Sequence, residues 1–428
     1  MKLFPNSPNR YRCWVVGLLL TAAFLSYFDR LIVSVLKTTL KTEFRIDDAG
    51  YALLINVFTG CYAVAYLISG WLTDRIGPRR ALTLFVGVWS MVGALCGIAK
   101  NFFQLAVLRA LLGLFEPGFQ PVSIRSGTVW APPARKGLFL SMCGAGSLFG
   151  AIAAPPLVTY IALHYHWRLA FILPGIVGVA LATVWWFTYR DPDAQDLPAN
   201  VPGKGAAPPV PALSWGELWR HRGVWGIMLS RFFNEPVWAF CLFWLPGYLH
   251  ESKGATFAQV GLLGWLPFVV GNLGGLGLSA ISDAVANRGR ERVHSRKLVM
   301  YVASAFGLLC IFIPGASLTG TLVLFCAITL LCISWLFMTT SLIAEVFPIG
   351  NVASIWGMAG AVGSVGAMIF NYLLGHASHL VGLPTLVLIM GCFHPCAALI
   401  LRLMVHPLRP VGKNPAQREP ASISAPAS

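Results

Sequence analysis

Charge is the property that this sequence most lacks. Only 11% of its 428 residues are charged, whereas a soluble protein of this length carries about 25%. Hydrophobic residues make up 57% of the chain, and the mean hydropathy is +0.70. The remaining polar surface is too small to cover a globule in water. The composition therefore excludes a soluble protein and predicts a surface that mostly faces lipid.

The sequence also lacks the residue patterns of catalytic sites, metal sites and disulfide frameworks. The charged groups form no nucleophile–base pair and no metal-ligand set, so we expect no enzyme and no cofactor. The ten cysteines lie mostly inside apolar runs, and their spacings fit neither a disulfide framework nor a metal site. Cys392 and Cys396 are close in sequence but have no further ligand nearby, so no metal is expected there either. The net charge of +15 lies at the ends of apolar runs, which favours a membrane over nucleic acid as partner.

Runs of about 20 apolar residues set the expected fold, because a helix of that length crosses the roughly 30 Å hydrocarbon core. The first run begins at Cys13 and continues past Asp29 without a cleavage site, so it is interpreted as an uncleaved span. The sequence predicts an all-α membrane protein of twelve transmembrane helices. The expected spans are 14–37, 50–72, 80–99, 102–125, 137–163, 168–189, 223–249, 257–281, 298–315, 319–344, 352–375 and 382–404.

Lysine and arginine distribute unevenly over the alternate loops. Of the 31 in the chain, 22 fall on the side of the N-terminus, six on the opposite side and three within spans. Positive residues concentrate on the cytoplasmic side of membrane proteins. We therefore expect a multi-pass protein of the bacterial inner (plasma) membrane with both termini in the cytoplasm.

The chain divides into two halves of six spans each. Residues 1–190 form the N-terminal half and 223–404 the C-terminal half. A proline-rich cytoplasmic linker at 191–222 joins them, and a tail at 405–428 is expected to be disordered. The segment around Asp283 repeats, in decayed form, a segment around Asp74 in the first half. Two related halves suit an alternating-access transporter, for which a monomer suffices.

The segment from Gly70 to Arg80, Gly-Trp-Leu-Thr-Asp-Arg-Ile-Gly-Pro-Arg-Arg, joins the second and third spans. It resembles the cytoplasmic loop signature of the major facilitator superfamily, and the whole chain fits that plan. The resemblance implies that the glycine lets two helices approach, the carboxylate caps a helix and the arginines clamp an inner gate. The gating residues implied are Gly70, Asp74, Arg75, Gly77, Arg79 and Arg80.

Finer motifs resemble the anion:cation symporter branch of that superfamily, which carries sugar acids and other organic carboxylates. They are Tyr27-Phe28-Asp29-Arg30, Arg109 to Glu116, His166-Trp167-Arg168, Tyr189 to Pro192, Phe243 to Leu249 and Glu345 to Pro348. They are similar to hexuronate and galactonate permeases, which implies proton-coupled import of a sugar acid.

Charges inside the membrane mark function, since each costs about 2.5–3.5 kcal/mol on insertion scales. Arg109 and Glu116 share one face of the fourth span, two turns apart, and do not pair directly. Gly113 between them leaves a gap, which we expect Asp29 to enter. Pro117 frees the carbonyl of Gly113 and softens the helix there. Pairing that merely pins helices together is the alternative for these charges.

Asp29 and Arg30 point about 100° apart on their helix, so they face different surroundings. We expect Arg30 to hold the substrate carboxylate by a bidentate contact. Asp29 and Glu116 would take up protons, with Arg109 moving toward or away from them during the cycle.

Four further residues are expected to bind substrate. Tyr62 and Tyr66 present hydroxyls on one helix face, although packing is an equal alternative. Asn371 is expected to line the cavity, and Trp238 belongs to a segment, 234–238, that we expect to interrupt its helix. Glu235 either joins this sugar pocket or pairs with Arg231, one turn away.

Two arginines in the cavity favour an anionic cargo. The sequence thus predicts a secondary transporter that imports a sugar acid, a hexuronate or aldonate, with protons. Uptake of an aromatic carboxylate or dicarboxylate is an alternative. A proton-coupled drug antiporter is another, although the span at 137–163 lacks the Gly-Pro-rich motif of such proteins.

Overall fold

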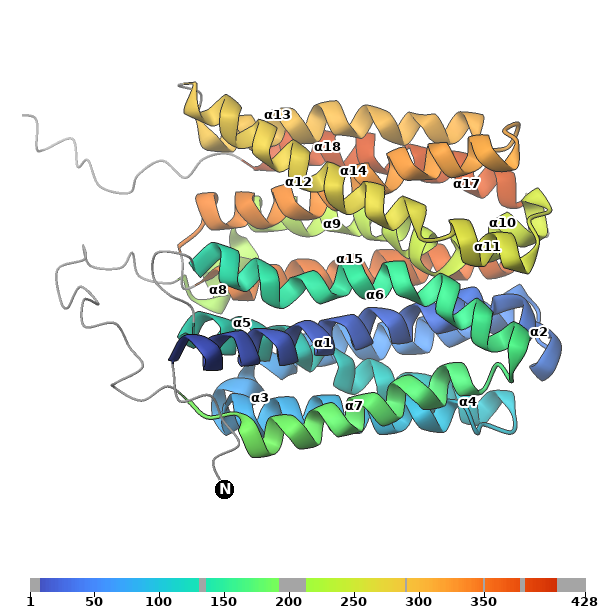
Figure 1. The fold of residues 1–428 in the computed structure, drawn as a ribbon. Coiled ribbons are helices and arrows are strands. Elements are labelled where there is room, and N and C mark those ends of the chain that lie inside the picture. The colour runs from blue at the N-terminus through green and yellow to red at the C-terminus, as the bar shows by residue number, and fades with distance from the viewer. Residues whose placement is uncertain are drawn as a thin grey trace, which may run out of the picture.

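The computed structural model describes residues 8–130, 136–191, 213–288, 291–348, 351–377 and 382–405. Within these ranges the chain is helical throughout, and the helices run roughly side by side along one direction (Figure 1). We call the end at which α1 begins and α18 finishes the inner end, and the opposite end, with α2, α10 and α11, the distal end (Figure 1). The all-helical fold class is as predicted.

The N-terminal half contributes the first group of helices. They are α1 (Pro8–Val35), α2 (Lys37–Phe44), α3 (Asp48–Cys96), α4 (Phe102–Phe115), the 3-10 turn η1 (Glu116–Gly118), α5 (Phe119–Trp130), α6 (Lys136–His164) and α7 (Leu169–Thr188).

The C-terminal half contributes the second group. They are α8 (Trp215–Arg220), α9 (Arg222–Ala239), the π turn η3 (Phe240–Trp244), α10 (Leu245–Lys253), α11 (Phe257–Leu263), α12 (Leu266–Asn287), α13 (Arg292–Ser304), η4 (Ala305–Phe312), α14 (Leu318–Val346), α15 (Val352–His376), α17 (Leu383–Gly391) and α18 (Phe393–Met404).

Eleven helical stretches in the described part of the chain are long and apolar enough to cross a membrane. The expected span at 223–249 is absent from that set because Arg231, Asn234 and Glu235 lower its hydropathy. It consists of α9, η3 and α10, which follow one another directly. The helix passes through Pro236, and the irregularity comes at 240–244. The prediction of an interruption at 234–238 was therefore wrong by several residues.

The expected linker is partly helical. Its last residues form α8, where Ser214 and Glu217 make a capping box that satisfies the first free N–H groups. Most of the linker (192–212) and the tail beyond residue 405 lie outside the described residues.

Small residues allow the helices to approach closely, and Gly146 and Gly150 of α6 are two examples. A Cβ atom on Gly146 would lie 1.8 Å from the carbonyl oxygen of Leu20, and one on Gly150 would lie 2.3 Å from that of Phe24. In a membrane this close packing replaces the hydrophobic effect as the force that joins helices. It fixes α6 against α1, the helix that carries Asp29 and Arg30.

The buried side chains show where the two halves meet. One continuous apolar core contains the N-terminal half together with distal parts of the C-terminal half, among them Phe243, Leu249 and Phe370. The inner end of the C-terminal half has a core of its own, which includes Ile227 and Leu342. The halves are thus joined at the distal end and have separate cores at the inner end.

Candidate functional site

Arg30 is the centre of a polar cluster inside the membrane. Its Nε donates to Glu116 Oε1, and its Nη2 donates to the Tyr62 hydroxyl at 2.8 Å. The rings of Tyr27 and Tyr62 lie 5.2 and 4.7 Å from the guanidinium carbon. Ser26, one turn before Arg30, also donates to Glu116 Oε1 at 2.9 Å. The site therefore holds one cation, one carboxylate and two phenol rings in direct contact.

A break in the fourth span positions Glu116. The helix α4 ends at Phe115, and Pro117 sits in the 3-10 turn η1, which confirms the predicted irregularity. The expected entry of Asp29 beside Gly113 was wrong. A Cβ there would lie 2.2 Å from the carbonyl oxygen of Phe58, so the backbone of α3 already fills the gap. Glu116 pairs with Arg30 instead.

Asp29 and Arg30 do face different surroundings. Asp29 is buried next to Gly93 of α3, within electrostatic range of Arg109 and Glu116. Arg109 is also buried, with its guanidinium 4.3 Å from the centroid of Phe58. Its Nε and Nη2 have no hydrogen-bond partner among the described residues. As expected, no ion pair between Arg109 and Glu116 occurs in the described part of the chain.

The second predicted tyrosine extends the cluster toward the other half. The Tyr66 ring lies 5.4 Å from that of Tyr62, and Tyr66 contacts Trp356 of α15. The Trp356 ring lies 5.1 Å from the guanidinium carbon of Arg231. Arg231 in turn binds Glu235 at 2.7 Å, which bears out the pairing alternative for these two residues.

The other expected substrate residues lie apart from this cluster. Trp238 is half-buried and packs edge-on against Phe268. Asn371 is fully buried and accepts a hydrogen bond from the Trp244 indole at 3.0 Å. Asn371 therefore does not line an open cavity in this conformation, because the distal end of the bundle closes over it. Asn234 is likewise buried, bonded to His394 at 2.8 Å.

The described arginines of the predicted inner gate contact their own half or are exposed. A Cβ on Gly70 would meet nothing within 4 Å, so nothing packs against that face of the glycine. Gly77 has φ +79°, a conformation that suits glycine, and bends the chain between the second and third spans. Arg79 donates to the Trp186 carbonyl at 2.7 Å, within its own half. Arg75 stacks on neighbouring Trp71, Arg80 is exposed, and the side chain of Asp74 lies outside the described set.

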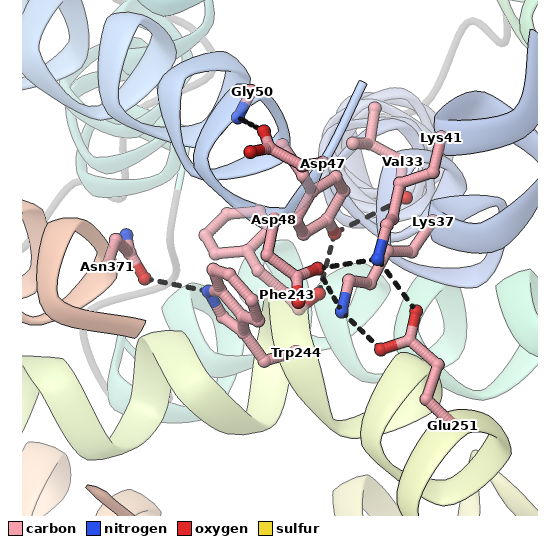
Figure 2. A network of polar contacts seen from close by, with 11 residues as sticks. Val33, Lys37, Lys41, Asp47, Asp48, Gly50, Phe243, Trp244, Glu251 and Asn371 are labelled. Atoms are coloured by element: carbon pink, nitrogen blue, oxygen red, sulfur yellow. Dashed lines mark hydrogen bonds and ion pairs between the residues drawn. The ribbon is translucent and has the colours of Figure 1, made fainter. Parts of the chain in front are cut away.

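Charged residues close the distal end instead, as Figure 2 shows. Lys37, at the start of α2, is fully buried and binds Glu251 of α10 at 2.8 Å and Asp48 of α3 at 3.0 Å. Lys41 binds Asp48 at 2.9 Å and lies 3.5 Å from Glu251. Because Glu251 belongs to the other half, we call these four residues the distal latch.

Backbone and aromatic groups reinforce the distal latch. The Tyr51 hydroxyl donates to the Phe243 carbonyl at 2.7 Å, and the Trp244 ring lies 4.8 Å from Lys37 Nζ (Figure 2). Burial alone would lower the pKa of Lys41, but Asp48 and Glu251 raise it above its usual value. Lys41 therefore stays charged at neutral pH and would lose its proton only in strong base.

The distal latch was not predicted, because no pattern in the sequence marks Lys37 and Lys41 as its residues. Their partner Glu251 is more than 200 positions away, so the pairing leaves no local pattern. Ser26 was also not predicted, although its position one helical turn before Arg30 places both residues on the same face of the helix.

Comparisons with known proteins are consistent with this arrangement. The sequence model of the Major Facilitator Superfamily matches residues 19–340. A probable L-galactonate transporter of Escherichia coli K12 is 31% identical over 76% of this chain and 74% of its own. The hexuronate transporter of the same strain is 25% identical over 91% and 93%. A probable sulfoacetate transporter of Cupriavidus necator is 28% identical over 85% and 87%.

Among solved structures, a bacterial homologue of the human lysosomal transporter Spinster, described as inward-facing and unoccupied, has the same fold. Its TM-score is 0.72 at 17% identity, over 92% of this chain and 97% of that one.

Proposed function

The chain belongs to the major facilitator superfamily of membrane transporters, and from that premise we propose that it imports a small sugar acid, a hexuronate or aldonate, by proton symport. As a member of that family it is a multi-pass membrane transporter and not an enzyme. The proposal places it in the bacterial inner membrane, with both termini in the cytoplasm, working as a monomer.

The observation that carries the proposal is the contact of Arg30 with Glu116 and Tyr62. A guanidinium binds a carboxylate through two parallel N–H groups. In this structure Glu116 occupies one of these donors. A substrate carboxylate that reaches Arg30 replaces Glu116, while the hydroxyls of Tyr62 and Tyr66 are placed to bond sugar hydroxyls. The sugar-acid transporters among the relatives support the same substrate class.

In this proposal, transport is coupled to protons when the substrate carboxylate displaces Glu116 from Arg30. A carboxylate that loses its cation in a low-dielectric interior binds a proton more readily. Asp29, buried beside Gly93, is the second candidate acid, with Arg109 as the cation that tunes both. A negative interior opposes anion entry by about 2.3 kcal/mol per charge per 100 mV, so at least one proton must accompany a monoanion.

The joined distal end and the separate inner cores fit a state that faces the inner side. In the proposed cycle, the distal latch opens to admit substrate and proton from the periplasm. The Gly70–Arg80 segment then closes the inner end, with Arg75, Arg79 and Arg80 as its clamp.

Uptake into proteoliposomes tests the proposal directly. With an imposed inward proton gradient, labelled galacturonate, glucuronate, galactonate and an aromatic acid are offered in turn. We expect a sugar acid to accumulate and the accumulation to collapse with a protonophore. Accumulation of the aromatic acid alone would keep proton symport but refute the sugar pocket at Tyr62 and Tyr66. Export of an organic cation against the gradient would replace the proposal with antiport.

A further inference from the structure

A second ion pair inside the membrane has no role in the transport scheme above. Arg231 and Glu235 lie one turn apart on α9, with Nη2 and Oε2 at 2.7 Å. The side chain of Arg231 is 9% exposed and that of Glu235 is 23% exposed. Charges at this depth are costly and rarely present without a use.

A purely structural role does not explain the pair. Both residues belong to one helix, so their contact ties no two helices together. The neighbouring helix α15 is already held by glycine packing: a Cβ on Gly366 would lie 2.2 Å from the Phe232 carbonyl oxygen. The ion pair itself is therefore not needed to join α9 to α15, although the Arg231 guanidinium does contact the Trp356 ring of α15.

A row of aromatic rings links this pair to Arg30. Arg231 stacks on Trp356, Trp356 contacts Tyr66, and Tyr66 packs on Tyr62, whose hydroxyl binds Arg30. The Tyr27 phenol lies within electrostatic range of both Arg30 and Glu235. Two guanidinium groups, one from each half, thus stand at the two ends of one aromatic wall.

Arg231 also has unused binding capacity. Its Nε is buried and has no hydrogen-bond partner among the described residues. A guanidinium has five N–H donors, and Glu235 occupies Nη2. The remaining donors match a second oxyanion, which would bind beside or in place of Glu235.

We propose that Arg231 and Glu235 form a second anion subsite, and that a sugar acid with an anionic group at each end therefore binds more tightly than a hexuronate or aldonate. The inference rests on the proposed function, since Arg30 takes the first carboxylate. Arg231 takes the second, and Glu235 holds Arg231 in position while the subsite is empty. A substrate of this shape bridges the two halves, with its hydroxyls along the aromatic wall.

Two acids with the same carbon chain separate this subsite from the rest of the pocket. Galactarate has a carboxylate at both ends, and galactonate has one. In proteoliposome uptake we expect a half-saturation concentration for galactarate that is lower by about tenfold or more, as one added charge-assisted contact gives. Arg231→Gln should remove most of this difference and change galactonate by less than about twofold.

Substitutions of Arg231 and Glu235 should change the binding of galactarate in opposite directions. Glu235→Gln removes the competitor and leaves Arg231, so galactarate should bind more tightly. Arg222→Gln, at the exposed start of the same helix, serves as the matched control and should change neither acid. Gel filtration of each variant checks that it is folded.

Several results would overturn the subsite. One is an equal half-saturation concentration for galactarate and galactonate in the unaltered protein. Another is an equal rise of both half-saturation concentrations in Arg231→Gln. Weaker galactarate uptake in Glu235→Gln would show that the pair only positions α9. In each case continued galactonate uptake leaves the proposed function standing, whereas uptake of neither acid refutes that function as well.

Discussion

Glu116 has two donors from a single turn of α1, the Ser26 hydroxyl and the Arg30 guanidinium. At the scale of the residue, this is a carboxylate whose charge depends on one movable cation. In the proposed cycle Arg30 turns to the substrate, which leaves the Ser26 hydroxyl as the donor to Glu116. The loss of a cation in a low-dielectric site favours the protonated acid, and this is how the proposal couples substrate binding to proton binding at one oxygen.

Glu116→Gln tests this coupling. Glutamine keeps the size of the side chain and can still accept from Ser26, but it cannot carry a proton through the cycle. We expect proton-driven accumulation to fall to the level seen without a gradient, while exchange of labelled for unlabelled substrate continues. Uptake and counterflow in the same proteoliposomes measure the two activities.

Glu217→Gln is the control for this substitution, since Glu217 caps α8 outside the predicted spans. It should accumulate substrate normally. Normal accumulation in Glu116→Gln itself would remove Glu116 from the proton pathway and leave Asp29 as the remaining acid.

The sequence predicted which charged residues lie within the spans, but not their contacts. Asp29, Arg30, Glu116 and Arg231 stand out because a charge within an apolar run is visible without a structure. The partner of Glu116 was not predictable, because the gap at Gly113 could be filled by any neighbouring helix. The backbone of α3 fills it, and Arg30 reaches Glu116 by another route.

At the scale of the helix, two helices can approach closely where one of them has a glycine, whose side chain is a single hydrogen atom. Gly146 faces the backbone of α1, whereas a Cβ on Gly17 of α1 would meet nothing within 4 Å. The same substitution should therefore have opposite consequences at the two positions.

Gly146→Ala should destabilise the protein by roughly 1–3 kcal/mol, as overpacking does, because the helices must separate. Gly17→Ala should be neutral or stabilising, since alanine is the better helix former by about 1 kcal/mol. Thermal unfolding in detergent compares the two variants. Equal melting temperatures would show that α1 and α6 do not rely on this contact.

Helix positions were predictable from hydropathy, but the local irregularities were not. Proline at 236 suggested a broken helix, since it frees the carbonyl of Phe232. The helix nevertheless continues through Pro236, with Gly366 of α15 packed against that carbonyl, and the irregular turn forms later, at Phe240–Trp244. Such contacts with distant helices cannot be predicted from hydropathy.

At the scale of the whole molecule, the two halves are joined by contacts between residues far apart in sequence. The Tyr51–Phe243 hydrogen bond spans 192 positions. Hydropathy can locate each half, but it cannot show which end of the bundle is joined. That information lies in tertiary contacts such as the distal latch.

Glu251→Gln should loosen the distal end. It removes the only carboxylate that the C-terminal half contributes to the distal latch, while Asp48 still neutralises Lys37. Lys37 is buried but Glu251 is partly exposed, so we expect a loss of about 1–2 kcal/mol for the closed state. Hydrogen exchange in α2 and α10 should accelerate about five- to thirtyfold, because opening exposes both elements.

Glu43→Gln provides a matched control at the same end. Glu43 pairs with Arg168 at 2.9 Å, but both residues belong to the N-terminal half, so this ion pair does not join the halves. Its loss should leave exchange in α10 unchanged. If Glu251→Gln and Glu43→Gln had the same effect on α10, the distal latch would be an ordinary surface cluster. The join between the halves would then rest on the Tyr51–Phe243 bond and the apolar core alone.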